Sequence, residues 1–427
     1  MTTSVLTATL GFVNVFITAR ALGPEGRGTL AFLTTIAMLA SQLSSLGVEE
    51  ASANIAGMRP ERRPTLATNA VVLAVLCGAA AMGIIAVSVA VFPSVGGDAS
   101  TSLLWLALAS IPLLVAQFYF QFLVRADYGF GVANAAALIA PLLNVTANGV
   151  LAAFGLITVA TAMSTWIIGQ LLATLLLARY IAKNLVGFGR PDRALARESV
   201  GFGLKAHAGR VMKTGNYRLD QWLLGSIAGS TELGYYTIAV AWTEALFFLP
   251  EALAAVIRPE IVRADRREAG VRTAFVFRIG LMLTAPGVLF LVLAAPFLCV
   301  TIFGDEFHSS INDLRVLAPG AFGIVALKVL ANALVAQRRP LLSTAAVAVA
   351  FLLTIGLDLL LIPSHGGLGA AIASTAAYTA GGIATVVLFV RALGIPVAEL
   401  VPRLGDLRAV KDRGAELGRL VPRRRSV

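Results

Sequence analysis

The chain has 427 residues, of which 58% are hydrophobic and only 13% charged, and its formal net charge is +11. A soluble domain is nearer half apolar and a quarter charged, so this composition excludes an ordinary soluble globule and indicates that lipid is the solvent. A strong positive charge on a soluble protein would suggest nucleic acid as a partner. Here the excess of Lys and Arg is explained by membrane topology, and we expect no nucleic acid partner.

Apolar stretches of the length that spans a bilayer, about 20 residues each, recur along nearly the whole chain. They run without a period of two, which excludes the strands of a membrane β-barrel and predicts helices. The expected fold class is therefore an all-α polytopic membrane protein with about twelve transmembrane helices. The approximate spans are residues 4–20, 29–48, 65–92, 101–124, 131–153, 158–182, 199–226, 234–256, 274–300, 311–336, 341–362 and 368–391.

The distribution of Lys and Arg predicts the orientation of these spans, because positive residues concentrate in cytoplasmic loops. With the N-terminus inside, 26 of the 34 Lys and Arg residues lie on the inner side, three lie in outer connections and five lie within spans. We therefore expect a multi-pass protein of a cytoplasmic membrane with both termini cytoplasmic. The basic tail, residues 394–427, is expected to contact anionic membrane lipids.

An internal repeat divides the chain into two halves of six spans. The segments Gly23–Gly28 and Gly229–Gly234 share a G-x4-G spacing, and each precedes the second span of its half. Two halves that both start inside predict six-helix lobes related by a pseudo-two-fold axis along the membrane normal, with a site between them. We expect lobes at residues 1–184 and 199–393, joined by a cytoplasmic linker at residues 185–198.

The seventh span carries an unusual set of charges. Successive residues are about 100° apart around a helix axis, so four of these charged side chains lie within an arc of roughly 140° and share one helix face. Charge inside a bilayer is costly and marks functional candidates, so these residues predict a water-filled cationic cavity for an anionic head group such as a pyrophosphate. The alternative is that the cations pair with acids on other spans or reach toward the membrane surface. The residues are Lys205, Arg210, Lys213 and Asp220 on the shared face, with Arg218 nearby.

Three further charged residues lie within other spans. Lys328 in the tenth span is a candidate for the same cavity, or for a pair with Glu244 or Asp358. Glu244 and Asp358 are buried acids that could bind a coupling cation or neutralise the seventh span.

Polar residues in the first half are weaker candidates. Gln117, Gln121 and Arg125 are spaced four residues apart and share a helix face, where amides suit sugar hydroxyls, although hydrogen bonds between helices are the plainer interpretation. Glu49 and Glu50 end the second span, as part of a gate or as a solvated helix end.

The sequence contains no phosphate-binding Walker loop, no HExxH motif, no metal-ligand spacing of His or Cys and no nucleophile elbow. We therefore expect no enzymatic activity, no cofactor and no metal site. A membrane glycan polymerase or ligase, or a non-transporting scaffold, is the alternative outside transport. A polymerase would need a large outer loop with catalytic residues, and none is present between the predicted spans.

Several segments resemble the polysaccharide transporters of the multidrug/oligosaccharidyl-lipid/polysaccharide exporter superfamily, over about residues 10 to 395. They are Ala19–Gly28, Asp220–Gly225, Gly234–Ala239, Leu249–Pro250, Arg258–Pro259, Phe303–Gly304, Leu314–Pro319 and Ile362–Ser374. The first span is shorter than that pattern leads us to expect, which suggests a missing start or a start codon assigned too late.

The resemblance implies a flippase for undecaprenyl-pyrophosphate-linked oligosaccharides in a bacterial cytoplasmic membrane, working by alternating access. It places Lys205, Arg210, Lys213 and Arg218 at the lipid pyrophosphate. It also makes the polysaccharide polymerase and glycosyltransferases of the same pathway candidate partners. Alternatives within the superfamily are a lipid II flippase, which usually has fourteen spans, and a cation-coupled drug exporter, which would be expected to have an acidic cavity.

Overall fold

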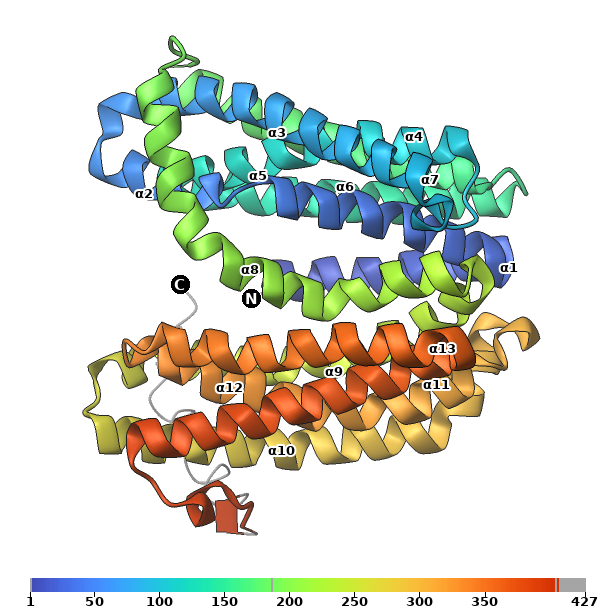
Figure 1. Ribbon diagram of the computed structural model, residues 1–427, viewed down its shortest axis with the longest axis vertical. Coiled ribbons are helices and arrows are strands. Elements are labelled where there is room, and N and C mark those ends of the chain that lie inside the picture. Colours follow the sequence, from blue (N-terminus) through green and yellow to red (C-terminus); the bar gives the residue numbers. More distant parts are fainter. Residues whose placement is uncertain (1, 186, 404, 407–427) are drawn as a thin grey trace, which may run out of the picture. The chain divides into compact units, whose positions relative to one another are not determined.

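The computed structural model describes residues 2–185, 187–403 and 405–406, and nearly all of them are helical (Figure 1). No strand occurs in these ranges, so the predicted all-α class is confirmed. The α-helices are α1 (Thr2–Ser44), α2 (Val48–Met58), α3 (Arg63–Val91), α4 (Thr101–Ala109), α5 (Ile111–Ala126), α6 (Phe130–Ala153), α7 (Val159–Asn184), α8 (Arg193–Ile227), α9 (Ser230–Arg263), α10 (Arg266–Pro296), α11 (Ser310–Leu317), α12 (Ala321–Ala336) and α13 (Pro340–Leu393). A π-helical turn extends α10 over Phe297–Thr301, and short 3-10 turns lie at Pro60–Arg62, Pro93–Gly96, Asp305–Phe307, Ala318–Gly320 and Val397–Leu400.

The described helices account for the predicted twelve spans. Nine helical segments in this part of the chain are long and apolar enough to cross a membrane. Two of them contain a break, at Gly23 in α1 (φ 66°) and at Gly366 in α13 (φ 51°), where a positive φ favours glycine. Each broken helix therefore provides two spans. Helix α8, with 35 residues, is long enough to be the remaining span, although its charges make it less apolar than the others.

Large apolar side chains on these helices are exposed, as expected of a protein whose solvent is lipid. Ile84 on α3 is 66% exposed, and Leu360 on α13 is 69% exposed. A soluble protein rarely presents extended apolar surface. The chain is therefore a multi-pass membrane protein.

The helices form two compact units. The first comprises Met1–Trp242, Ala294–Leu317 and Phe351–Ser374, and the second comprises Thr243–Leu293, Ala318–Ala350 and Thr375–Val427. The predicted lobe boundaries at residues 184, 198 and 393 stay a prediction. Most of the predicted basic tail, residues 407–427, lies outside the described residues.

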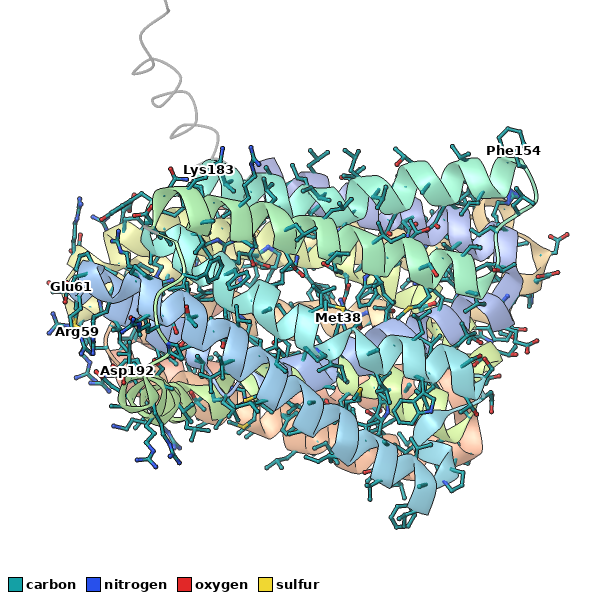
Figure 2. All side chains as sticks on the ribbon, turned by 90° about the horizontal axis from the view of Figure 1, so that it is seen from above. Met38, Arg59, Glu61, Phe154, Lys183 and Asp192 are labelled. Carbon is teal, nitrogen blue, oxygen red and sulfur yellow. The ribbon has the colours of Figure 1, made fainter. Side chains whose placement is uncertain are left out.

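The first unit packs α1 against α6 and α8, and α5 against α3, α2 and α7. Its largest fully buried side chains are aromatic and include Tyr119, Tyr236 and Phe32. Figure 2 shows Arg59, Glu61 and Asp192 at one end of this unit and Phe154 at the opposite end. Charged loops thus gather at one end of the helices, as the predicted topology requires of residues 59–63 and 190–197.

The second unit has a continuous apolar core. It is built by α9, α10, α12 and the end of α13, where Phe277, Val325, Leu330 and Phe389 pack together. Residues after α13 close this core, because Leu400 is buried in the same cluster. Asp406, which accepts two hydrogen bonds from Arg278 of α10, belongs to the same closing segment.

The two G-x4-G segments of the internal repeat meet within the first unit. Gly23 and Gly229 both have positive φ, 66° and 90°. A Cβ atom added to Gly28 would lie 1.7 Å from the carbonyl oxygen of Ser230, and one added to Gly234 would lie 2.0 Å from the carbonyl oxygen of Pro24. Gly28 therefore packs on Ser230, which follows Gly229, and Gly234 packs on Pro24, which follows Gly23. This reciprocal contact is the relation that a pseudo-two-fold axis produces.

Candidate functional site

The start of α8 is fixed by a helix cap and by contacts to α3. Asp192 precedes the helix and accepts hydrogen bonds from the backbone amides of Leu195 (3.1 Å) and Ala194 (2.9 Å), which satisfy two free donors of the first turn. These amides, with the Arg62 guanidinium 3.0 Å away, hold the pKa of Asp192 below its ordinary value. Asn69 of α3 donates to the Asp192 carbonyl (2.9 Å) and accepts from its amide (3.0 Å).

The predicted basic face of α8 is divided by burial. Lys205 and Lys213 are exposed, whereas Arg210 and Arg218 are half-buried and Asp220 is buried. Arg210 and Asp220 belong to two separate polar clusters along the helix. The structure therefore keeps these residues on one continuous helix and gives them different surroundings.

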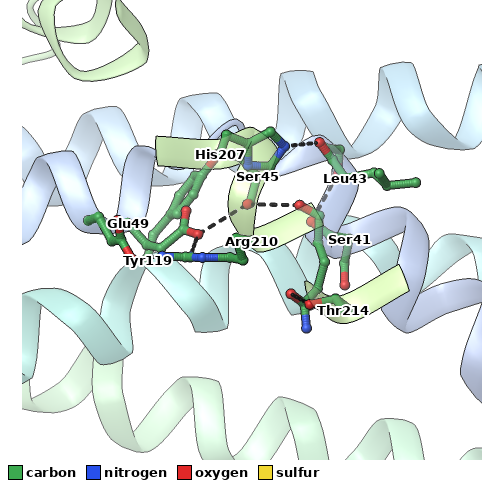
Figure 3. A network of polar contacts seen from close by, with 11 residues as sticks. Ser41, Leu43, Ser45, Glu49, Tyr119, His207, Arg210 and Thr214 are labelled. Atoms are coloured by element: carbon green, nitrogen blue, oxygen red, sulfur yellow. Dashed lines mark hydrogen bonds and ion pairs between the residues drawn. The ribbon is translucent and has the colours of Figure 1, made fainter. Parts of the chain in front are cut away.

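Arg210 is held by two carboxylates at the start of α2 (Figure 3). Its guanidinium forms ion pairs with Glu49 and Glu50. The side chain of Glu49 is only 2% exposed and that of Glu50 is 43% exposed. The guanidinium carbon also lies 5.5 Å from the centre of the Phe122 ring, a cation–π contact. A guanidinium matches two acceptors in a plane, so Arg210 links α8 to α2 and α5.

Further hydrogen bonds extend this network to α1 and α5 (Figure 3). Ser45 donates to a Glu49 oxygen (3.2 Å), and Tyr119 donates to the Ser45 carbonyl (2.8 Å). The Nε2 atom of His207 lies 2.9 Å from the Leu43 carbonyl, which fixes Nε2 as the protonated nitrogen.

Two atoms of the network have no hydrogen-bond partner among the described residues. They are the second carboxylate oxygen of Glu49 and Nδ1 of His207, and both are buried. A buried acceptor without a partner is costly. The network beside Arg210 could therefore accept further hydrogen bonds at these two atoms.

The second cluster on α8 is a pair of buried acids. Asp220 accepts hydrogen bonds from the hydroxyls of Tyr236 (2.5 Å) and Ser374 (3.3 Å). Asp358 of α13 is fully buried and close enough for its charge to be repelled by Asp220. Neither oxygen of the Asp358 carboxyl has a hydrogen-bond partner in the described chain. Because buried polar groups are nearly always paired, this carboxyl is an exception among the buried groups of the first unit.

The other predicted site residues lie on α5, α9 and α12. Gln117 and Gln121 are half-buried on α5 of the first unit. Lys328 of α12 belongs to the second unit, where its ammonium lies 2.5 Å from the Glu251 carboxylate. Glu244, also in the second unit, is half-buried on α9.

The sequence is compatible with Glu49 and Glu50 either as part of a gate or as a solvated helix end. Glu49 is 1% exposed, so the solvated interpretation does not hold for this residue. Its role as the partner of Arg210 was missed because 161 residues separate the two in the chain. The signal that pointed to it was the shortage of acids within the spans compared with the cations of α8.

Within residues 2–185, 187–403 and 405–406, no group of three or more His, Cys, Asp and Glu side chains is arranged to hold a metal ion.

Comparison with known proteins gives a family match over most of the chain. The model of a family described as "Polysaccharide biosynthesis protein" matches residues 17–312. No curated protein has a significantly similar sequence.

Solved structures share the fold at low sequence identity. An inward-facing multidrug resistance MATE family transporter of the MOP superfamily has a TM-score of 0.71 at 16% identity, over 90% of this chain and 93% of that one. The lipid II flippase MurJ in an inward closed conformation has a TM-score of 0.72 at 13% identity, over 93% of this chain and 88% of that one. A MOP superfamily transporter from Pyrococcus furiosus, described as having a binding pocket of reverse polarity, has a TM-score of 0.59 at 14% identity, over 92% and 94% of the two chains.

Proposed function

Because the chain belongs to the family of polysaccharide biosynthesis proteins and has the fold of MOP superfamily transporters, we propose that it flips a lipid-linked oligosaccharide across a membrane. The resemblance found in the sequence is thereby confirmed at the level of the family. The proposed substrate is an oligosaccharide on undecaprenyl pyrophosphate. The proposed location is a bacterial cytoplasmic membrane with both termini cytoplasmic, as the Lys and Arg distribution favours.

The observation that carries this proposal is the ion-paired Arg210 of α8. The arginine lies midway along a helix of membrane length, and its side chain is 23% exposed. Guanidinium groups bind carboxylate and phosphate oxygens with the same planar geometry. A diphosphate that enters from the exposed side can therefore replace Glu49 and Glu50 on the guanidinium.

This exchange gives substrate binding a structural consequence. In the absence of substrate, Arg210 ties α8 to the start of α2 through two carboxylates. A bound diphosphate competes for the same donors and weakens that tie. A ligand shifts a conformational equilibrium only through such a difference in contacts between states. Lys205 and Lys213, exposed on α8, are proposed to attract the anionic head group.

We propose Asp358 and Asp220 as the site of a coupling cation, either a proton or an alkali ion. The support is the fully buried Asp358 carboxyl with two unpartnered oxygens, beside a second acid and the hydroxyls of Tyr236 and Ser374. Oxygen ligands of this kind suit hard cations. Glu244 is the remaining candidate from the sequence.

Alternating access is supported by the reciprocal glycine contact. In the proposed topology the segments Gly23–Gly28 and Gly229–Gly234 lie on the outer side, and their backbones touch. This favours a state closed at the outer end, from which the substrate would load on the inner side.

The product is proposed to be chemically identical to the substrate, so the protein acts without catalysis. A polysaccharide polymerase and glycosyltransferases would then act on either side of the transport step as partners.

The test is flipping of a labelled prenyl-diphosphate oligosaccharide in proteoliposomes that contain the full chain. We expect the wild type to flip it and Arg210→Gln to flip it about tenfold or more slowly, since a charge-assisted pair contributes about 1.5–3 kcal/mol. Arg272→Gln is the matched control, because Arg272 also binds two glutamates, Glu260 and Glu268, but lies at an exposed surface.

Each outcome separates the alternatives. Equal rates in the Arg210 and Arg272 variants would discard Arg210 as the diphosphate site and keep the flippase. Flipping of lipid II in preference to the oligosaccharide lipid would reassign the substrate. Transport of organic cations with no flipping of either lipid would replace the proposal with a drug exporter.

A further inference from the structure

A cavity of about 430 Å³ lies in the first unit, between α1, α3, α8 and α13. This volume lies within the range of about 300–1,000 Å³ that small-molecule sites occupy. Its lining includes Leu43 of α1, Ser88 of α3, Val211, Thr214 and Trp222 of α8, and Phe351 of α13. Leu43 and Phe92 are more than half exposed, so the cavity reaches the apolar surface of the protein.

The wall of this cavity is almost entirely apolar. The Thr214 hydroxyl donates to the side-chain oxygen of Gln42 (3.0 Å), and Ser88 donates to a carbonyl within its own helix. The indole nitrogen of Trp222 is buried and has no hydrogen-bond partner in the described residues. Apolar cavities do not hold ordered water, so the occupant is expected to be hydrocarbon.

The lining residues of the cavity follow the length of α8. On α8 its lining residues run from Val211 to Trp222, a distance of about 16 Å at 1.5 Å per residue. A long apolar space parallel to membrane-spanning helices fits an extended aliphatic chain better than a compact molecule.

One end of the cavity adjoins the ion-paired arginine. Val211 follows Arg210 directly, and Thr214 lies one helical turn beyond it. His207, one turn before Val211, contacts the backbone of Leu43, which lines the cavity. A ligand with an anionic head and an aliphatic chain can therefore place its head at Arg210 and its chain in the cavity.

We propose that the cavity binds the polyprenyl chain of the transported lipid, over the isoprene units nearest the diphosphate. The proposal rests on the proposed function, because it joins the chain in the cavity to the diphosphate at Arg210. It assigns the lipid carrier, and not only the head group, a specific site on α8, α1 and α3.

The test uses a polyprenyl diphosphate that carries a diazirine in its first isoprene units, with the full-length protein in nanodiscs. After irradiation, mass spectrometry locates the labelled peptides. We expect label on residues 36–43 and 211–222, reduced by unlabelled polyprenyl diphosphate but not by phosphatidylglycerol. Wild-type mapping needs no variant and so does not depend on the folding of a mutant.

A pair of variants gives the quantitative arm. Val211→Trp fills part of the cavity and is expected to lower labelling about tenfold. This is the loss of affinity expected when two methylene groups of the lipid chain, each contributing about 0.8 kcal/mol, are excluded from the cavity. Val75→Trp, at an exposed site of α3 that does not line the cavity, is expected to label like the wild type.

The cavity assignment is overturned if the label falls elsewhere, or if phosphatidylglycerol competes as well as the prenyl lipid, which would make the cavity a bulk-lipid site. Flipping measured on the same preparation separates the two proposals. Label outside the cavity with flipping intact overturns only the tail site. Label in the cavity without flipping supports the lipid site and overturns the flippase.

Discussion

The contact between the two repeat segments predicts an effect of a single methyl group. Gly28→Ala would place a Cβ 1.7 Å from the carbonyl oxygen of Ser230, so the backbones must separate by well over an ångström. Overpacking of this kind costs about 1–3 kcal/mol. Alanine favours a helix over glycine by about 1 kcal/mol, so propensity alone would stabilise the variant. We take the overpacking cost near its upper value, because the added methyl group meets a backbone atom that cannot rotate away. Subtracting the gain in helix propensity leaves a net loss of about 2 kcal/mol, which lowers the population of the closed contact roughly 30-fold.

Hydrogen exchange of the amides in residues 226–234 measures this population, since exchange there requires local opening. We expect roughly 30-fold faster exchange in Gly28→Ala and a similar effect in Gly234→Ala, whose Cβ would lie 2.0 Å from the Pro24 carbonyl oxygen. The control is Gly83→Ala on α3, where an added Cβ meets no atom within 4 Å. Exchange as slow in Gly28→Ala as in Gly83→Ala would refute the closed glycine contact.

Two further predictions concern carboxyl groups. Asp358→Asn should abolish the stimulation of flipping by an imposed proton or sodium gradient, a coupling typically worth 5- to 150-fold, and stimulation that persists in this variant would remove Asp358 from the coupling site. Hydrogen bonds from Arg278 (2.7 and 2.8 Å) hold the pKa of Asp406 below its ordinary value. The ionised carboxylate therefore stabilises the fold above about pH 4, and this stabilisation is lost as the pH falls through the lowered pKa. Asp406→Asn should therefore lower stability by about 1–3 kcal/mol at pH 7, with a difference in melting temperature that shrinks in acid, whereas a difference that is constant with pH would contradict the ion pair.

The spans and the repeat could be predicted from the sequence because they depend on local composition. The length of an apolar run determines whether a helix can cross a bilayer. The spacing of Gly23–Gly28 and Gly229–Gly234 indicated the repeat, and both first glycines have the positive φ that ends one helix before the next begins. The sequence also identified α8 as the charged helix, since its Lys, Arg and Asp residues are visible without any knowledge of packing.

Only the tertiary structure decided which groups these residues contact. Helical periodicity gives the direction of Arg210 around α8 but not the neighbour it meets, and its partners Glu49 and Glu50 come from about 160 residues away. The same holds for Asp220, whose buried neighbour Asp358 lies on α13, and for the apolar cavity beside Arg210, whose wall comes from α1, α3, α8 and α13. Side-chain chemistry and spacing along one helix are local properties, whereas ion pairs and cavities depend on how separate helices pack.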